Sequence, residues 1–254
     1  MGDSRDRIYH ATRPDPVRFE TVIDGLEQIE AVWAEMVRFA RAVGALRLGY
    51  HHLPPPGATD AACLRVENDG FGAALLAQYL AARQAGLAVL AASAINCVQP
   101  IYLDEMEARA DLTDREQAHL RGYRTAGVTH GLAFSVYGPN ARNGLFAAEL
   151  GPDTPRLPAA DLAALRWAGQ AMHLRYCELL APQLGRPPSL SEREAEVLSW
   201  VARGKSNATI GEILGISSHT VDAHLRRIYL KLGVVDRLSA ALRGLGFGLI
   251  RVDA

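Results

Sequence analysis

Three short helix patterns follow one another between residues 190 and 232, and they restrict how this part of the chain can fold. The first begins with Ser191 and Glu194, a capping box in which the serine oxygen and the glutamate carboxylate each accept a backbone amide. Ser206 caps the second, which ends at Gly215, a residue that adopts positive φ without a Cβ clash. Ser217 caps the third. Helices separated by a short glycine turn predict a helix-turn-helix.

Each pattern has an apolar stripe that predicts its buried side. The stripe of the third helix recurs at intervals of four, three and four residues, at Val221, Leu225, Ile228 and Leu232. The first two helices are expected to pack through Glu194, Leu198, Val201, Ala202, Ile210, Ile213 and Leu214. The opposite face of the third helix carries His219, Asp222, Ala223, Arg226 and Leu230. Most charged helix faces are merely solvated, but the second helix of a helix-turn-helix presents such a face to the DNA major groove.

The segment resembles the C-terminal DNA-binding domain of LuxR-type regulators through seven elements in the family's order, SEREAEVL, GKS, LGIS, TV, H, KLGV and R. The resemblance implies that Asp222, Ala223 and Arg226 face base edges. It also implies that the phosphate contacts come from Lys205, Ser206, Thr220, Arg227 and Lys231. Thr209 and Gly211 stand where the family usually has glutamate and alanine, and a glycine inside a helix costs about 0.5–1 kcal/mol relative to alanine.

The two charged residues of the predicted DNA-facing surface have different chemistry. Arg226 is suited to a bidentate pair with guanine O6 and N7, whereas Asp222 can only accept, for instance from cytosine N4. A carboxylate on this face repels phosphates. Because Asp222 precedes Arg226 by four residues, we expect the carboxylate to orient the guanidinium one helical turn further on.

Asp236 is positioned to cap a fourth helix that runs to about Leu245. The family resemblance implies that this helix pairs with its twin in a dimer through Leu238, Ala241, Leu242 and Leu245. An equally weighted alternative is that these residues only close the small domain core. Two-fold pairing would make the DNA site a palindrome with half-sites roughly ten base pairs apart.

The segment 182–188, PQLGRPP, is rich in proline and glycine and predicts a linker. The expected domains are therefore residues 1–181 and residues 189–254. From Ser189 onward nine lysines and arginines stand against seven acidic residues, a net charge of +2, and the whole chain carries −1, which leaves −3 for the remainder. This modest positive charge predicts salt-sensitive DNA binding that is helped by dimerisation.

The first domain mixes helix and strand patterns. Helices are predicted at 26–43, at 71–85, from the Thr113 and Glu116 capping box to about 126, and at 159–180. Strands are predicted at 46–53, 61–67, 131–138 and 145–150, with a hairpin through Pro139, Asn140, Asn143 and Gly144. This order predicts an antiparallel sheet with helices on both faces. The whole chain is expected to be α+β, with an all-α, four-helix C-terminal domain.

The first domain resembles the autoinducer-binding domain of the LuxR family, an α/β/α sandwich that holds an acyl-homoserine lactone between its sheet and one helical layer. The best local match is residues 126–151, with Gly131 at the family's glycine position. The family's pocket uses a Trp and a Tyr four residues apart, an Asp-Pro pair and a second Trp. The corresponding positions here hold Leu75 and Tyr79, Gly86-Leu87, and Ile101 or Tyr102.

The missing aspartate changes the expected ligand. A carboxylate that accepts the amide N–H of a ligand in an apolar pocket contributes about 1.5–3 kcal/mol. We therefore expect the pocket to bind something other than a standard acyl-homoserine lactone, or nothing. The resemblance implies that it is lined by Leu75, Tyr79, Tyr102, Leu120, Tyr123, Val128 and Ala147. Ordinary core packing is the alternative for each residue, and a ligand-independent regulator, whose first domain only dimerises or binds a protein partner, is the alternative for the chain.

Other classes of function find little support in the residues. The histidines at 10, 51, 52, 119, 130 and 173 lack metal-binding spacing, and the chain has no serine nucleophile elbow, phosphate loop or HExxH motif. We expect no enzyme, metal site or cofactor. Cys63, Cys97 and Cys177 are sparse and far apart, which is typical of reduced cytoplasmic thiols. Neither a signal peptide nor an apolar run of membrane-spanning length is evident, so a cytoplasmic protein without membrane contact is predicted.

Overall fold

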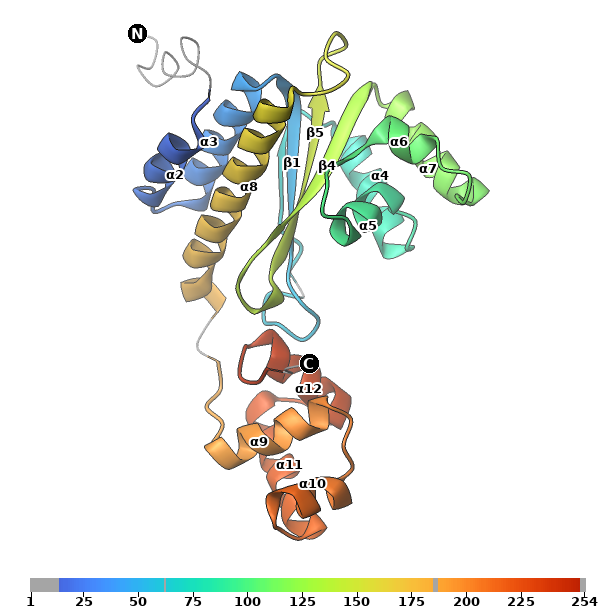
Figure 1. The fold of residues 1–254 in the computed structure, drawn as a ribbon. Coiled ribbons are helices and arrows are strands. Elements are labelled where there is room, and N and C mark those ends of the chain that lie inside the picture. Colours follow the sequence, from blue (N-terminus) through green and yellow to red (C-terminus); the bar gives the residue numbers. More distant parts are fainter. Residues whose placement is uncertain (1–13, 62, 185–186, 252–254) are drawn as a thin grey trace. The chain divides into compact units, whose positions relative to one another are not determined.

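The computed structural model of the chain describes residues 14–61, 63–184 and 187–251 (Figure 1). Contacts along the chain divide it into two compact units. The first comprises residues 1–53, 65–138 and 143–180, and the second comprises residues 54–64, 139–142 and 181–254. Each unit has a hydrophobic core of its own.

The first unit is built on a five-stranded sheet with the order β2-β1-β5-β4-β3, in which neighbouring strands are antiparallel. The strands are β1 (Ala45–Leu53), β2 (Val66–Asp69), β3 (Ile101–Tyr102), β4 (His130–Tyr137) and β5 (Asn143–Leu150). β4 and β5 form the predicted hairpin, with the stacked rings of Phe134 and Phe146 directly opposite each other at 5.2 Å. Within the turn η1 (Pro139–Ala141), Asn140 has φ of 53°, a left-handed conformation in which Asn is enriched.

Helices cover both faces of this sheet (Figure 1). One layer consists of α2 (Pro16–Asp24), α3 (Ile29–Ala42) and α8 (Ala159–Leu180). The other consists of α4 (Ala73–Gln84), α5 (Val89–Asn96), α6 (Leu103–Glu107) and α7 (Asp114–Thr125). The predicted α/β/α sandwich around an antiparallel sheet is confirmed.

The pleat of the sheet assigns side chains to the two layers. Tyr50 lies opposite Phe146, and its ring packs edge-on against Tyr176 of α8 at 5.1 Å. This face therefore meets α8. The next residue, His51, lies opposite Leu145 and contacts Tyr79 of α4 on the other face. Strand β1 thus separates two different environments.

Several sequence predictions for this unit need correction. The second strand is Val66–Asp69 rather than 61–67 and pairs with β1 from Leu48 to His51, and residue 62 of the predicted strand lies outside the described residues. Helix α3 starts at Ile29 rather than 26, and Leu46 of β1 is 55% exposed. Short α5 and α6, and α2 with its Asp15 cap, were not predicted.

The C-terminal residues of the second unit form four helices, as predicted. They are α9 (Glu192–Ala202), α10 (Asn207–Leu214), α11 (Ser218–Leu232) and α12 (Arg237–Gly246), and the short helix η2 (Ala181–Leu184) precedes them. The four predicted capping side chains accept backbone amides as expected, at Ser191, Ser206, Ser217 and Asp236. Residues 185 and 186 of the predicted linker lie outside the described residues.

The core of these four helices follows the predicted stripes with one exception. Val221, Leu225, Ile228 and Leu232 are all buried. Ile213, predicted to pack inward, is 44% exposed, whereas Ile210 and Gly211 are the buried residues of short α10. Gly211 is buried against the following turn, where a Cβ would lie 2.6 Å from the carbonyl oxygen of Ile216. This close approach gives a packing reason for a glycine that weakens the helix.

No single helix among the described residues is both long and apolar enough to cross a membrane, although the bent pair α4 and α5 together meets the length and composition requirement. None of the three cysteines forms a disulfide bond. Cys63 and Cys97 are exposed and Cys177 is buried.

Replacing Gly144 of β5 by alanine is expected to lower the free energy of unfolding by about 1–3 kcal/mol through overpacking. A Cβ there would lie 2.6 Å from Cε2 of Tyr50 and 3.0 Å from Nδ1 of His173. Gly25→Ala is the matched control, because Gly25 has negative φ and its nearest neighbour would be 3.7 Å away. Chemical denaturation of both variants checks the prediction, and equal stabilities would contradict it.

Candidate functional site

Helix α11 is held with one face buried and the other open to solvent. Its aliphatic seam lies in the core, while the side chain of Arg226 is 76% exposed. Asp222 and Ala223 are partly exposed on the same side, and Leu230 is 84% exposed. These residues form the solvent-facing side of α11.

The predicted contact between Asp222 and Arg226 is formed. A carboxylate oxygen of Asp222 lies 2.7 Å from a guanidinium nitrogen of Arg226. Both side chains are exposed, so this pair adds little to stability. Its main effect is to hold the guanidinium along the helix face.

Lys231 has a structural contact in addition to its predicted role at phosphates. Its Nζ donates to Glu194 Oε2 at 2.6 Å, and the same oxygen accepts the backbone N–H of Ser191 at 2.8 Å. The residue Glu194 is only 3% exposed. Burial acts to raise the pKa of Glu194, but the hydrogen bonds from Lys231 and Ser191 outweigh it and lower the pKa below its ordinary value. The C-terminal turn of α11 is thereby tied to the start of α9.

The other residues predicted to contact phosphates lie at helix starts or on the surface. Ser206 is exposed and caps α10, with its Oγ accepting Thr209 N–H at 3.2 Å. Thr220 lies in the first turn of α11, its hydroxyl 2.8 Å from that of Ser217. Lys205 and Arg227 are exposed. Helix N-termini favour phosphate groups.

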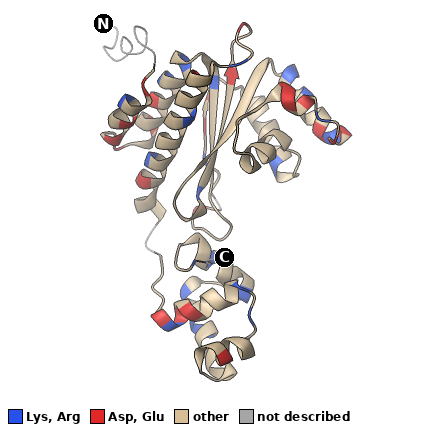
Figure 2. Cartoon of the chain, in the orientation of Figure 1, with Lys and Arg blue, Asp and Glu red and all other residues tan. Residues whose placement is uncertain are grey.

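Figure 2 shows that basic and acidic residues are interspersed on helices α9 to α12.

The residues predicted for dimerisation through α12 divide between surface and core. Leu238 is 67% exposed. Ala241 is buried in the domain core, and Leu245 packs against it. Leu242 is partly exposed. Ala241 therefore serves the core of the domain. Leu238 is available for a contact with another molecule.

A cavity of about 90 Å³ lies in the first unit between the sheet and α4, α5 and α7. Strands β1 and β2 contribute Gly49, Tyr50, His51, Val66, Glu67 and Asn68 to its lining. The remaining lining residues are Phe71, Leu75, Leu76, Tyr79, Leu90, Ala91, Tyr123, Ala133, Leu145 and Ala147. Most of these side chains are apolar.

A histidine and a tyrosine provide the central polar contact of this cavity. Nδ1 of His51 and the hydroxyl of Tyr79 are 2.8 Å apart and share a hydrogen bond. Burial, together with the charges of Arg83 and His52, lowers the pKa of His51 to about 4. Burial also raises the pKa of Tyr79 and of Tyr123. His51, Tyr79 and Tyr123 are consequently neutral at neutral pH.

Four of the seven residues predicted for ligand binding line the cavity, namely Leu75, Tyr79, Tyr123 and Ala147. Leu120 and Val128 lie instead in the adjoining hydrophobic core. His51, which also lines the cavity, was not among the predicted ligand-binding residues. His51 lies opposite Leu145 of the neighbouring strand β5, and this position can be assigned only once the strand register is known.

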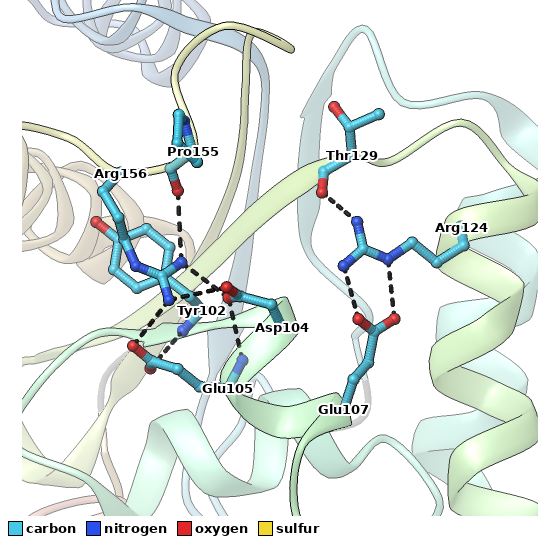
Figure 3. A network of polar contacts seen from close by, with 8 residues as sticks. All are labelled: Tyr102, Asp104, Glu105, Glu107, Arg124, Thr129, Pro155 and Arg156. Atoms are coloured by element: carbon cyan, nitrogen blue, oxygen red, sulfur yellow. Dashed lines mark hydrogen bonds and ion pairs between the residues drawn. The ribbon is translucent and has the colours of Figure 1, made fainter.

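Tyr102, the remaining predicted ligand residue, stacks beneath Arg156 (Figure 3). The guanidinium lies 3.8 Å from the centre of the ring and also binds Asp104 at 2.8 Å and Glu105 at 3.2 Å. Hydrogen bonding to Arg156 lowers the pKa of Asp104. A second pair, Arg124 with Glu107 at 2.6 Å, links α7 to the end of α6. Tyr102 therefore helps to fix α6 rather than line the cavity.

The opposite face of the sheet contains a group of potential metal ligands that sequence spacing did not reveal. His52 of β1 meets His173 and Cys177 of α8, and one donor atom from each lies within 4.8 Å of the others. All three residues are buried. His52 is separated from His173 and Cys177 by more than a hundred residues along the chain, so only the fold brings the three together.

Two family models match the chain. Residues 28–176 match the family described as autoinducer binding domain, and residues 188–243 match bacterial regulatory proteins, luxR family. The first match alone covers more than half of the chain. The chain belongs to the LuxR-type regulators.

Individual relatives are consistent with this family. The putative HTH-type transcriptional regulator y4qH of Sinorhizobium fredii is 29% identical over 60% of this chain and 47% of its own length. The transcriptional activator protein SolR of Ralstonia solanacearum is 34% identical over 50% of this chain and 56% of its own. The chain thus spans about half the length of the curated relatives that it matches. These relatives are named as regulators and not as enzymes.

Solved structures of SdiA share the fold of this LuxR-type chain. A crystal structure of the Escherichia coli protein has a TM-score of 0.63 and 20% identity, covering 92% of this chain and 99% of that one. A second SdiA structure, in complex with octanoyl-rac-glycerol, has the same score and identity and covers 92% of this chain and 94% of that one.

Replacing Lys231 by methionine is expected to destabilise the link between α9 and α11 by about 1–3 kcal/mol at pH 7, because buried Glu194 loses a donor. The lowered pKa of Glu194 means that this contribution is present above the ordinary pKa of a glutamate and is lost as the pH falls below it. Hydrogen–deuterium exchange of α9 peptides should therefore differ from the wild type at pH 7 and converge with it in acid. Arg227→Met, on the exposed side of α11, is the control, and an equal effect of both changes would contradict the prediction.

Proposed function

We propose that this LuxR-type chain is a transcription regulator that binds double-stranded DNA through the outer face of α11. The exposed guanidinium of Arg226, held by Asp222 on a helix whose opposite side is sealed, carries the proposal. An arginine in this state is prepared for bidentate contact with a guanine. Asp222 and Ala223 would lie at base edges beside it, and phosphates would be bound by Lys205, Ser206, Thr220, Arg227 and Lys231.

The active form in this proposal is a homodimer on a palindromic site. Leu238, exposed near the start of α12, is the best supported of the predicted contacts between copies, with Leu242 beside it. Ala241 and Leu245 would support this surface from the core. The domain limits 1–181, 182–188 and 189–254 belong to the same proposal. Its site of action would be the cytoplasm, where the DNA is, and it would catalyse no reaction.

We further propose that the cavity of the first unit receives a small, uncharged and largely apolar signal. The apolar lining and the hydrogen-bonded pair of His51 and Tyr79 support this class. The pair can exchange its mutual hydrogen bond for one to a ligand. A standard acyl-homoserine lactone fits less well, because Leu75 and Gly86-Leu87 replace the family's tryptophan and Asp-Pro pair.

A ligand-independent regulator is the second candidate, and one observation favours it. The cavity of about 90 Å³ is much smaller than the roughly 300–1,000 Å³ that is typical of ligand sites. In this alternative the first unit serves as a dimerisation or protein-interaction module.

Arg226→Ala is expected to weaken binding to DNA selected from a random-sequence pool by the wild-type chain, by about 1–3 kcal/mol, and to relax preference at one base position. Arg227→Ala should instead weaken binding to all sequences alike and reduce its salt dependence. Arg18→Ala, an exposed arginine of α2, controls for the loss of one positive charge. Gel-shift titrations check these outcomes. Failure of the wild type to enrich any sequence, or no change with Arg226→Ala, would overturn the proposal.

Standard acyl-homoserine lactones are expected to leave the melting temperature of the full chain almost unchanged, because the carboxylate that accepts their amide is missing. Thermal melting with a panel of these lactones and with octanoyl-rac-glycerol checks this. A strong stabilisation by any acyl-homoserine lactone would refute the expectation. Stabilisation by an uncharged lipid that is abolished in Tyr79→Phe would favour the signal-binding regulator over the ligand-independent one.

A further inference from the structure

Two imidazoles and a thiol converge in the layer between the sheet and α8. His52 is 1% exposed, His173 is fully buried and Cys177 is 5% exposed. His173 and Cys177 are four residues apart and therefore share one face of α8. His52 projects from β1 on the same side as Tyr50, and this side packs against α8. The fold thus directs three good metal donors to one place.

The separation of the donor atoms fits a tetrahedral metal ion. Sγ of Cys177 lies 3.7 Å from Nε2 of His173. An ion with a 2.3 Å bond to sulfur and a 2.0–2.1 Å bond to nitrogen would hold these ligands about 3.6 Å apart. The donor atom of His52 lies within 4.8 Å of the other two, so its ring would move toward them when the ion binds.

The hydroxyl of Tyr50 orients both imidazole rings. It lies 2.7 Å from Nδ1 of His173 and 3.4 Å from Nδ1 of His52. Metal-binding histidines characteristically hydrogen-bond through the ring nitrogen that does not touch the metal, and this fixes the ligating nitrogen. For His173 this contact leaves Nε2, the nitrogen that faces Sγ of Cys177, to bind the ion. Gly144 provides the space for this arrangement, since a Cβ there would lie 3.0 Å from Nδ1 of His173.

We propose that His52, His173 and Cys177 form a binding site for Zn²⁺ between β1 and α8. Neutral imidazoles and a thiolate are the donors that zinc prefers, and they leave one position of its tetrahedron for a further ligand. Binding displaces the thiol proton of Cys177 to solvent. Because the ligands come from β1 and α8, the ion would hold α8 on the sheet and stabilise the first unit. The competing account is a hydrogen-bonded core cluster without metal.

The test uses the full chain, freed of metal by refolding in the presence of a chelator and then exchanged into zinc-containing buffer. We expect elemental analysis to find about one zinc per chain, and zinc to raise the melting temperature of the metal-free protein. Cobalt added in place of zinc should produce the near-ultraviolet absorption of a thiolate–Co²⁺ bond. Cys177→Ser should abolish this absorption and the bound zinc, whereas Cys97→Ser, which changes an exposed thiol, should retain both.

The wild-type protein alone decides the question if Cys177→Ser does not fold. Folded wild type with far less than one zinc per chain, and without thiolate–Co²⁺ absorption, would overturn the proposal and leave the hydrogen-bonded cluster. Zinc retained in full by folded Cys177→Ser would overturn it equally.

Discussion

Successive side chains of a β-strand point to opposite faces of its sheet, and the first unit depends on this alternation along β1. Tyr50 and His52 enter the layer of α8, where they meet His173 and Tyr176. His51, between them, enters the cavity and bonds Tyr79. Strand β1 pairs along the length of β5, which is one arm of the hairpin with β4. The register of this pairing decides which side chains of β1 face each helical layer. The cavity and the cluster of His52, His173 and Cys177 thus lie on opposite faces of the sheet, and the same strand pairing positions both.

The C-terminal helices depend on a different constraint, the satisfaction of helix ends. Each of the four helices starts with a side-chain cap, and α10 and α11 end at glycines with φ near 65°. Glu194 serves both as the capping-box carboxylate of α9 and as the acceptor for Lys231 of α11. One buried carboxylate therefore sets the first and third helices relative to each other, and through them the direction in which Arg226 points.

How much the sequence could predict differed between the two units for physical reasons. Caps and stripes are local, so α9 to α12, and the pair of Asp222 and Arg226, followed from short spacings. The long α8 and the hairpin were likewise predicted. Short β2, α5 and α6 were missed or misplaced because their stability comes from long-range packing rather than local signals. His51 and the cluster of His52, His173 and Cys177 needed the strand register and the packing of α8, which no local spacing contains. Tyr102 was misassigned because its stacking under Arg156 joins residues 54 positions apart.

Adjacent histidines with separate surroundings have a consequence for how such a chain can diversify. Substitution at position 51 alters the wall that a signal would touch and leaves the packing of α8 intact. Substitution at position 52 does the reverse. The choice of ligand and the stability of the first unit can therefore change independently in evolution, although the two positions that affect them are adjacent in the chain. Insertion of one residue in β1, by contrast, would move each following side chain to the other face of the sheet and so would change the cavity wall and the packing of α8 together.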